Sequence, residues 1–347
     1  MNRKNTYFTC QITEMDKNIV IAKHMIEKAK KIALFGHMSP DGDCIGAMLG
    51  FGRLLEKQKK NISYFVPNKP SKIFNFVKGI KKLKTNFDYK QYDLLLFLDF
   101  TGLNRIGIIG QAKPQYFTDK SIIIFDHHPD DNGLAHGLLV KDVTSISTCE
   151  ILFEHTNKWW PHLYDKDVAT YFYLGITSDS GNFLFEEDHV RTFGNALKLL
   201  KLDADKDSVV NNLIRKRSLN AIKFLQLLLN RIKEKDGLLY TYYDEDEMKT
   251  YNVDAEEAAY ALHIIQNVDG PKMFLLMRKI GDVIKGSLRA KKAEGENRTQ
   301  GKIDCNAIAK ALGGGGHRLA AGFAVPVKGK FEQQIQDIIK YINKNRF

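Results

Sequence analysis

Three short apolar runs in this chain end in His or Asp, and this pattern limits the fold more than any other feature. The runs are Ile32–Phe35, Leu94–Leu98 and Ile122–Phe125, and the residues that follow them are His37, Asp99 and the triplet Asp126, His127 and His128. Each run, like Ile62–Val66, has the length of a buried strand. Helical patterns such as IGAMLGFGRLLEKQKK lie between them. This alternation predicts an α/β fold with a mainly parallel sheet flanked by helices.

The polar residues that follow these runs are expected to meet in space. The carboxyl ends of parallel strands lie along one edge of a sheet, and open α/β sheets bind their ligands there. The stretch HMSPDGD brings Asp41 and Asp43 to the same edge. A further carboxylate, Asp179, is predicted in the small-residue loop GITSDSGNF after an apolar helix.

Such a cluster suits divalent cations. Carboxylate and imidazole ligands without a thiolate favour Mn²⁺ or Mg²⁺. About six ligands are too many for one ordinary site, and they suit two ions roughly 3.5–4 Å apart, an arrangement common in phosphoester hydrolysis. Taken singly, each motif has a plainer reading, because Pro, Asp and Gly also form turns and caps. Their joint occurrence at strand ends favours a two-metal site.

The second half of the chain has a different character. Residues 188–235 read as a charged helical connector, in which the RKR at 215–217 is either a phosphate patch or a solvated helix face, with the second interpretation preferred. Strand-like runs at 238–243, 273–280 and 283–290 then alternate with helical patterns. The expected domains are therefore 1–187, the connector, and a smaller α/β domain at 236–347. Lys291–Lys302 is predicted to be a mobile loop.

A glycine-rich segment in the second domain is a candidate binding loop for a phosphate or carboxylate. Gly314, Gly315 and Gly316 precede His317, and backbone N–H groups of glycines can approach an anion closely. Arg289 follows the run VIKGSL and offers a planar fork that fits phosphate. The remaining histidines, including His263, are interpreted as structural.

Composition excludes several classes of protein. The chain has 347 residues, 44% of them hydrophobic, so it can bury a sizeable core, and its net charge of +11 permits an anionic partner. The N-terminus has no apolar segment typical of a signal peptide, and no run reaches the ~20 apolar residues of a membrane span. The cysteines are widely spaced (Cys10, Cys44, Cys149 and Cys305), which suits a reducing compartment. We expect a cytoplasmic protein without a membrane partner.

The motifs together resemble the DHH/DHHA1 phosphoesterases. HMSPDGDCIGA, YDLLLFLDFTGLNRIG, IIIFDHH and ITSDSGNF are similar to the four motifs of the DHH domain. GSLRA and GGGGHRLAAGF are similar to the substrate-binding motifs of the DHHA1 domain. The departures are small: Ala47 stands where Ser is common, and Ser flanks Asp179 where Thr is frequent.

The resemblance implies roles for individual residues. The expected metal ligands are His37, Asp41, Asp43, Asp99, His127 and Asp179, holding two Mn²⁺ ions or another divalent metal such as Mg²⁺. His128 is expected to face the scissile phosphate or to steady the site, Asp126 to orient a neighbouring imidazole, and Arg105 to reach phosphate. Arg289, His317 and the preceding glycines are expected to hold the far end of the substrate.

The resemblance leaves the substrate open. The preferred interpretation is hydrolysis of short oligoribonucleotides, of 3′-phosphoadenosine 5′-phosphate (pAp), or of both. The runner-up is a phosphodiesterase acting on cyclic di-AMP or its linear product pApA. A nucleotide-binding protein without catalysis is disfavoured because every ligand position is filled. An RNA-binding protein is disfavoured because acids stand beside the aromatic residues of TYYDED. No long duplex partner is expected, and a homodimer is compatible with the sequence.

Overall fold

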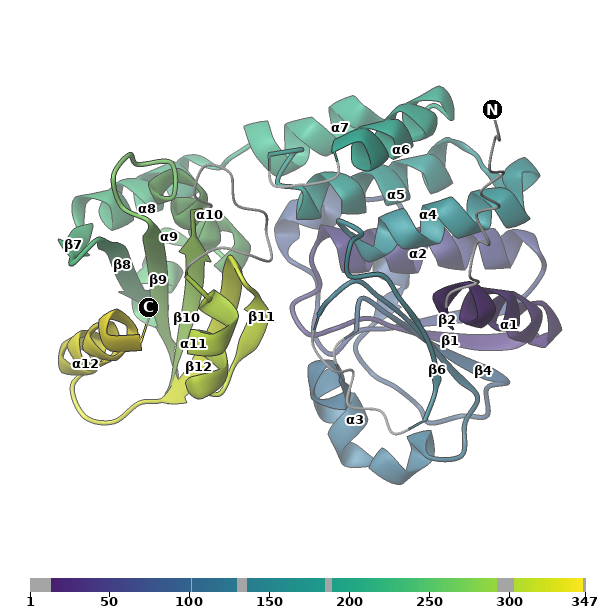
Figure 1. The fold of residues 1–347 in the computed structure, drawn as a ribbon, viewed down its shortest axis with the longest axis horizontal. Helices are drawn as coiled ribbons and strands as arrows, with labels where there is room; N and C mark the ends of the chain where they lie inside the picture. Colours follow the sequence, from purple (N-terminus) through teal and green to yellow (C-terminus); the bar gives the residue numbers. More distant parts are fainter. Residues whose placement is uncertain (1–13, 101, 130–135, 185–188, 292–302, 346–347) are drawn as a thin grey trace, which may run out of the picture.

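A computed structural model describes residues 14–100, 102–129, 136–184, 189–291 and 303–345. It contains two six-stranded sheets, each with its own helices and hydrophobic core (Figure 1). The predicted α/β class is confirmed, with a parallel sheet in the N-terminal domain and a mixed sheet in the C-terminal domain. The predicted loop Lys291–Lys302 lies, from residue 292 on, outside the described residues.

The N-terminal sheet is parallel throughout. Its strands are β1 (Lys31–Phe35), β2 (Asn61–Phe65), β3 (Leu83–Lys84), β4 (Leu94–Leu98), β5 (Ile122–Asp126) and β6 (Leu138–Lys141). The four strands predicted from apolar runs are present, and β3 and β6 extend the two edges. The order β3-β2-β1-β4-β5-β6 reverses direction between β1 and β4. A switch of this kind opens a crevice at the carboxyl ends of the strands.

Helices cover both faces of this sheet. They are α1 (Glu14–Lys28), α2 (Gly42–Lys57), α3 (Gly107–Ala112), α4 (Thr148–Trp159), α5 (Lys166–Asp179), α6 (His189–Lys201) and α7 (Lys206–Val210). Figure 1 shows α2, α4 and α5 on one side of the sheet and α3 on the other. The α2 side carries the largest core, whereas the opposite face is packed mainly with rings such as Phe35, Phe97 and Phe117.

Glycines let α2, α4 and α5 approach closely, and this packing positions the site. A Cβ on Gly46 of α2 would lie 2.3 Å from the carbonyl oxygen of Tyr171 in α5. A Cβ on Gly175 of α5 would lie 2.2 Å from Sγ of Cys149 and 2.6 Å from Oδ1 of Asp43. Only hydrogen fits at these two positions, so the first turn of α2 lies directly against the end of α5.

In the sequence, Ser147 followed three residues later by Glu150, and Asp165 ahead of an apolar helical pattern, predict two helix starts, and both are confirmed. Ser147 accepts a hydrogen bond from the backbone N–H of Glu150, and Asp165 accepts one from Val168. The expected reciprocal bond of a capping box at Ser147 is replaced, because the carboxylate of Glu150 accepts from the N–H of Ile146 instead. Asp179 was predicted in a loop, and it is the last residue of α5. The helix continues through Thr177 and Ser178 to Asp179.

The connector leads from α6 and α7 through a π-helical turn (Asn211–Arg215) to α8 (Leu219–Asn230). The C-terminal sheet has the order β11-β12-β10-β9-β8-β7. Its strands are β7 (Lys233–Lys235), β8 (Leu238–Asp244), β9 (Met273–Ile280), β10 (Val283–Ala290), β11 (Gly315–His317) and β12 (Ala320–Pro326). Its helices are α9 (Glu245–Tyr251), α10 (Ala255–Ile265), α11 (Cys305–Ala311) and α12 (Phe331–Asn345).

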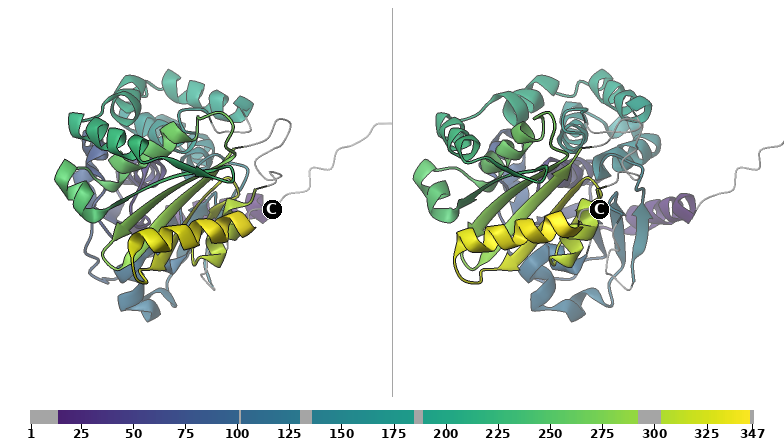
Figure 2. Two further views of the ribbon diagram at one scale, coloured as in Figure 1. Left: turned by 90° about the vertical axis from the view of Figure 1, so that its left-hand side faces the viewer. Right: turned by 60° about the vertical axis from the view of Figure 1, so that its left-hand side comes forward.

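Two cores sandwich the C-terminal sheet. The residues of α11 and α12 pack on one face, and those of α8 and α10 pack on the other (Figure 2). The helix α8 and the strand β7 lie in the segment expected to be a connector. In the structure, however, α8 packs against this sheet and β7 pairs with β8 as its edge strand.

The two domains also contact each other directly. Ser71 of the N-terminal domain donates a hydrogen bond of 2.7 Å from Oγ to Oδ2 of Asp254, while Oδ1 of Asp254 accepts the N–H of Glu257 at the start of α10. The carboxylate of Asp254 therefore caps α10 in the second domain and also binds Ser71 of the first domain. Within the described ranges, we find no helix with the length and apolar character needed to cross a membrane.

Candidate metal centre

The predicted ligands meet at the crevice where the strand order reverses. His37 follows β1 and Asp99 follows β4, the two strands on either side of the switch, and the two side chains are buried. Nε2 of His37 lies 3.0 Å from Oδ2 of Asp99 and 3.8 Å from Oδ1 of Asp41. Nδ1 of His37 lies 2.9 Å from the carbonyl of Met38, so that carbonyl orients the ring with Nε2 toward the carboxylates.

Asp99 is the central residue of the site. Its backbone has φ +56°, a left-handed conformation that few residues other than Gly, Asn and Asp tolerate. Its Oδ1 lies 3.4 Å from Nδ1 of His128 and 3.6 Å from Nε2 of His127. This buried oxygen and the buried Nε2 of His127 have no hydrogen-bond partner within the described structure. A carboxylate oxygen and an unprotonated imidazole nitrogen both offer lone pairs, so two such atoms without hydrogen-bond partners, 3.6 Å apart, fit a site for a cation.

Asp43 and Asp179 complete the cluster, together with His127. Nε2 of His127 lies 3.4 Å from Oδ2 of Asp179, which closes the last turn of α5. The fully buried carboxylate of Asp43 accepts hydrogen bonds from the first N–H groups of α4, Thr148 (2.7 Å) and Cys149 (2.9 Å). The sequence predicted the start of α4 but not this contact. A helix N-terminus favours the anionic form of a carboxylate, so the start of α4 offsets part of the cost of burying Asp43.

The ligand atoms group into sets of a size suited to single ions. His37, Asp41 and Asp99 form one set, and Asp43, His127 and Asp179 form another, with all ligand atoms of a set within 4.8 Å of one another. These six residues are the six predicted ligands. Their donor types, burial and orphaned atoms fit two hard or borderline divalent cations, with Asp99 between the two sets.

The charges of the cluster require compensation. Burial raises the pKa of Asp43 well above its usual range, and the neighbouring carboxylates Asp179 and Asp99 raise it further. Burial alone would lower the pKa of His127, but Asp179, Asp99 and Asp43 outweigh it and raise this pKa to about 10. Without metal the cluster therefore retains protons. Bound cations would replace these protons and remove the repulsion between carboxylates.

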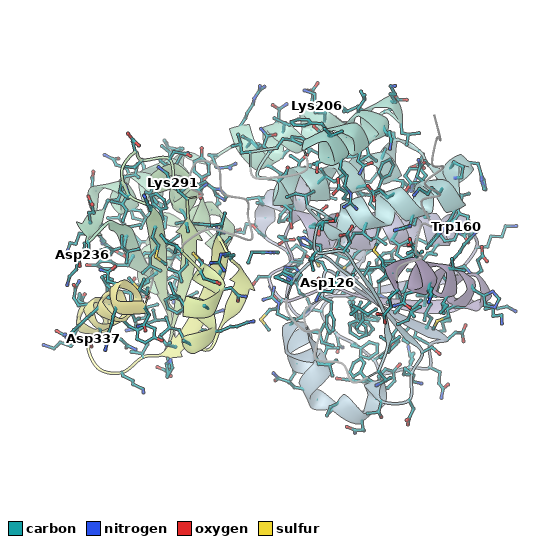
Figure 3. The ribbon with its side chains drawn as sticks, viewed as in Figure 1. Asp126, Trp160, Lys206, Asp236, Lys291 and Asp337 are labelled. Atoms are coloured by element: carbon teal, nitrogen blue, oxygen red, sulfur yellow. The ribbon has the colours of Figure 1, made fainter. Side chains whose placement is uncertain are left out.

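His128 is held by Asp126 as predicted. Nδ1 of His128 lies 2.8 Å from Oδ1 of Asp126, which is fully buried at the end of β5. This contact leaves Nε2 of His128 for another partner. Figure 3 shows Asp126 at the side of the N-terminal domain that faces the C-terminal domain. Arg105 lies next to the cluster, with Nη2 3.4 Å from Nδ1 of His37.

The structure corrects the expectation that His317 lies apart from the metal ligands. The ring of His317 lies 5.0 Å from that of His128 and 5.5 Å from that of His127, centroid to centroid. The second domain therefore places an imidazole at the cluster itself. His127, His128 and His317 also form a set with ligand atoms within 4.8 Å.

The glycine-rich segment is an edge strand rather than a free loop. Gly315–His317 form β11, which pairs antiparallel with β12. A Cβ on Gly314 would lie 2.0 Å from the carbonyl oxygen of Gly322, and Gly316 has φ +142°. These glycines are needed for the close approach of β11 to β12, in addition to any contact with a ligand.

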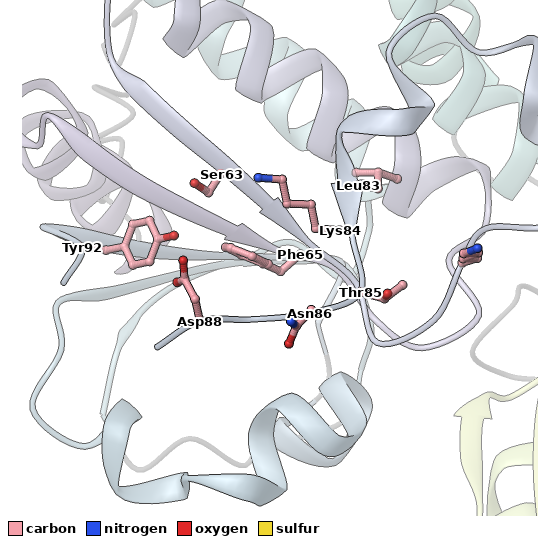
Figure 4. Close-up of a pocket in the computed structure, with 9 residues that line it drawn as sticks. Ser63, Phe65, Leu83, Lys84, Thr85, Asn86, Asp88 and Tyr92 are labelled. Carbon is pink, nitrogen blue, oxygen red and sulfur yellow. The ribbon is translucent and has the colours of Figure 1, made fainter. Parts of the chain in front are cut away.

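A separate cavity of about 480 Å³ lies at the edge of the N-terminal sheet (Figure 4). Ser63 and Phe65 of β2, Lys84 of β3, and Asp88 and Tyr92 line part of it. None of the predicted site residues lines it, so we assign it no part in the reaction.

Known proteins resemble both domains. Residues 31–176 match the model of the DHH family, N-terminal domain, and residues 236–344 match the DHHA1 domain. The chain is 26% identical over 331 residues to the bifunctional oligoribonuclease and PAP phosphatase NrnA of Mycoplasma genitalium, covering 94% of this chain and 99% of that protein. It is 23% identical to the NrnA of Bacillus subtilis, covering 85% of this chain and 89% of that one.

The fold is that of a solved relative. The crystal structure of an exopolyphosphatase-related protein from Bacteroides fragilis superposes with a TM-score of 0.80 at 22% identity, covering 94% of this chain and 96% of that one. Both domain models match in the expected order, and the matched ranges include every residue of the cluster described above except Asp179, which lies just beyond residue 176. The chain therefore belongs to the DHH/DHHA1 phosphoesterases, which are metal-dependent hydrolases of phosphoester bonds.

Proposed function

We propose that the chain hydrolyses short oligoribonucleotides, pAp, or both, at the candidate metal centre. The observation that carries this proposal is the position of His317 beside His127 and His128. A substrate that reaches the ligands must also fit against the second domain, which favours a short chain or a small nucleotide over a long one. The similarity to the two NrnA proteins supports the same substrate class.

The residues of the site have separate roles in the proposed reaction. His37, Asp41, Asp43, Asp99, His127 and Asp179 would hold two divalent ions, for which Mn²⁺ is the preferred choice. Such ions lower the pKa of a bound water and neutralise charge on a phosphoryl group. His128, oriented by Asp126, can donate to a phosphoryl or leaving oxygen, and Arg105 adds positive charge beside His37. Arg289 and the glycines that precede His317 bind the rest of the nucleotide, and His317 adds a donor beside His128.

A second candidate is a phosphodiesterase acting on cyclic di-AMP or pApA. The chain is 23% identical to the cyclic-di-AMP phosphodiesterase GdpP of Geobacillus thermodenitrificans over 91% of this chain, although it covers only 48% of that protein. The same set of ligands would serve either substrate. The candidates therefore differ only in the contacts made beyond the scissile phosphate.

A substrate panel separates the candidates. We would compare kcat/KM with Mn²⁺ for pAp, pApA, a pentanucleotide RNA, cyclic di-AMP and a short single-stranded DNA. The proposal expects the highest values for pAp or the RNA, and a maximum for cyclic di-AMP would replace it by the second candidate. An Asp99→Asn protein purified in parallel controls for contaminating nucleases. Absence of hydrolysis across the panel would refute both.

A further inference from the structure

One arginine of the RKR segment is turned inward. Arg215 and Lys216 are exposed, whereas Arg217 is half-buried, with its guanidinium carbon 4.4 Å from the ring centroid of Tyr260 in α10. Its Nη1 donates to the carbonyl of Lys216 and its Nη2 to that of Leu213. These bonds and the aromatic contact fix the plane of the guanidinium. The group has five N–H donors, so three remain for other partners.

The surroundings of Arg217 are basic. His263 lies one turn after Tyr260, and burial, followed by the charges of Arg289 and then Arg217, lowers its pKa to about 4. Both guanidinium groups therefore lie within electrostatic reach of one imidazole. Among the described residues no carboxylate forms an ion pair with Arg217. Glu257, whose charge opposes the lowering of the pKa of Arg217 by burial, accepts hydrogen bonds from the N–H of Asp254 and from Ser218 instead.

The strand register connects this group to the metal centre. Arg289 of β10 is paired with Ala320 of β12, and Ala320 is paired with His317 of β11. Residues directly opposite each other point to the same face of a sheet. Arg289 also pairs with Phe274 of β9, which belongs to the core formed with α10. His317 and Arg289 thus lie in one row about 10 Å long, two inter-strand spacings, on the face where α10 packs.

We propose that Arg217, held over Tyr260 of the helix that packs on this face of the sheet, binds a second phosphate of the substrate, remote from the phosphoester that is hydrolysed. This inference rests on the proposed nucleotide hydrolysis and names its specificity determinant. His317 lies beside His127 and His128, Arg289 lies farther along the row, and Arg217 lies over Tyr260 of α10, the helix that packs on the same face. A guanidinium stacked on an aromatic ring presents its N–H edge to a phosphate. A dinucleotide with a terminal phosphate supplies an anion at each end of this strip.

The test compares two dinucleotides that differ only in the terminal phosphate, pApA and ApA. We would measure kcat and KM with Mn²⁺ for the wild type, Arg217→Ala and Arg217→Lys. Arg215→Ala is the matched control, because it removes the same charge from an exposed position of the same segment. Thermal unfolding of each variant separates a loss of binding from a loss of packing against Tyr260.

We expect the wild type to prefer pApA and Arg217→Ala to reduce this preference about 10- to 100-fold, mainly through KM, as for a lost charged hydrogen bond. Arg217→Lys should retain part of the preference, and Arg215→Ala should retain all of it. An unchanged preference in Arg217→Ala, or equal losses on both dinucleotides with a lower Tm, would overturn the inference.

The outcome can be separated from that of the proposed function. If the wild type hydrolyses neither dinucleotide with Mn²⁺, that result counts against the proposed function. Calorimetric binding of pApA and ApA in metal-free buffer then decides the inference by itself. Tighter binding of pApA that is lost in Arg217→Ala supports it, and equal binding of the two dinucleotides refutes it.

Discussion

The imidazole rings of His128 and His317 lie 5.0 Å apart and are inclined by 27°, although the two residues belong to different domains. His128 is fixed from behind by Asp126, and His317 ends the edge strand β11. The face of the metal cluster is therefore shared between the domains, and its chemistry depends on how they meet.

This contact gives the first prediction. His317→Ala should lower kcat about 10- to 100-fold even for a small generic ester such as bis-p-nitrophenyl phosphate, because a donor beside the cluster is lost. Arg289→Ala, which alters the same row two strands away, should mainly raise KM for pApA. Steady-state kinetics of both variants on both substrates provide the check. Normal hydrolysis of the generic ester by His317→Ala would place this imidazole outside the reaction.

Removal of metal should inactivate and destabilise the protein. Among the described residues, the buried Oδ1 of Asp99 has no hydrogen-bond partner, and the carboxylates of Asp179 and Asp99 raise the pKa of Asp43. Chelation should abolish hydrolysis and lower Tm, and added Mn²⁺ should restore both. Differential scanning fluorimetry detects the shift without an activity assay. Full activity in excess chelator would exclude the two-metal interpretation.

A comparison of Asp99→Asn with Asp99→Ala should separate the effect of the lost negative charge on kcat from the effect of the backbone conformation at residue 99 on stability. Both remove the central carboxylate, so kcat should fall by roughly three orders of magnitude or more. At φ +56° Asn is tolerated better than Ala, so Asp99→Ala should have the lower Tm. Retention of more than about a tenth of kcat, a loss under roughly 1.4 kcal/mol, would contradict the role assigned to Asp99.

Gly175→Ala should damage both stability and turnover. The added methyl group would lie 2.2 Å from Sγ of Cys149 and 2.6 Å from Oδ1 of Asp43, so α5 must move away from the ligands. Overpacking of this kind typically costs about 1–3 kcal/mol. Gly194→Ala in α6 is the matched control, since its Cβ would meet nothing within 4 Å, and it should stabilise the helix by about 0.5–1 kcal/mol. Chemical denaturation of the two variants tests the difference.

Acid should weaken one ion-pair network of the N-terminal domain. Arg191 binds Asp142 and Glu154. Burial alone would raise the pKa of each carboxyl. Hydrogen bonds outweigh burial and lower both pKa values. Thr144 and Arg191 donate to Asp142, and Arg191 and Asn195 donate to Glu154.

A lowered carboxyl pKa contributes stability above the unfolded-state value near 4, and this contribution is lost as the pH falls through the folded-state pKa. Arg191→Met should therefore destabilise the protein by about 1–3 kcal/mol at pH 7 and by less near pH 3. Unfolding free energies at the two pH values check the sign. A difference independent of pH would mean that Arg191 acts through packing.

Local sequence determined much of the site. The apolar runs ending in His37, Asp99 and Asp126 predict strands from a few neighbouring residues, and all parallel strands present their carboxyl ends along one edge. The chemistry of the ligands was also readable, because donor types depend only on residue identity. The caps at Ser147 and Asp165 were predictable for the same reason, since a cap involves residues three apart.

Only the tertiary structure decided the contacts between distant segments. The N–H groups of α4 that hold Asp43, the position of His317 at the cluster and the inward turn of Arg217 join residues that no local pattern connects. A sequence period specifies which face of an element is apolar, but not which element covers it. These contacts are fixed by close packing, as at Gly46 and Gly175, and by strand register, as in the row from His317 to Arg289.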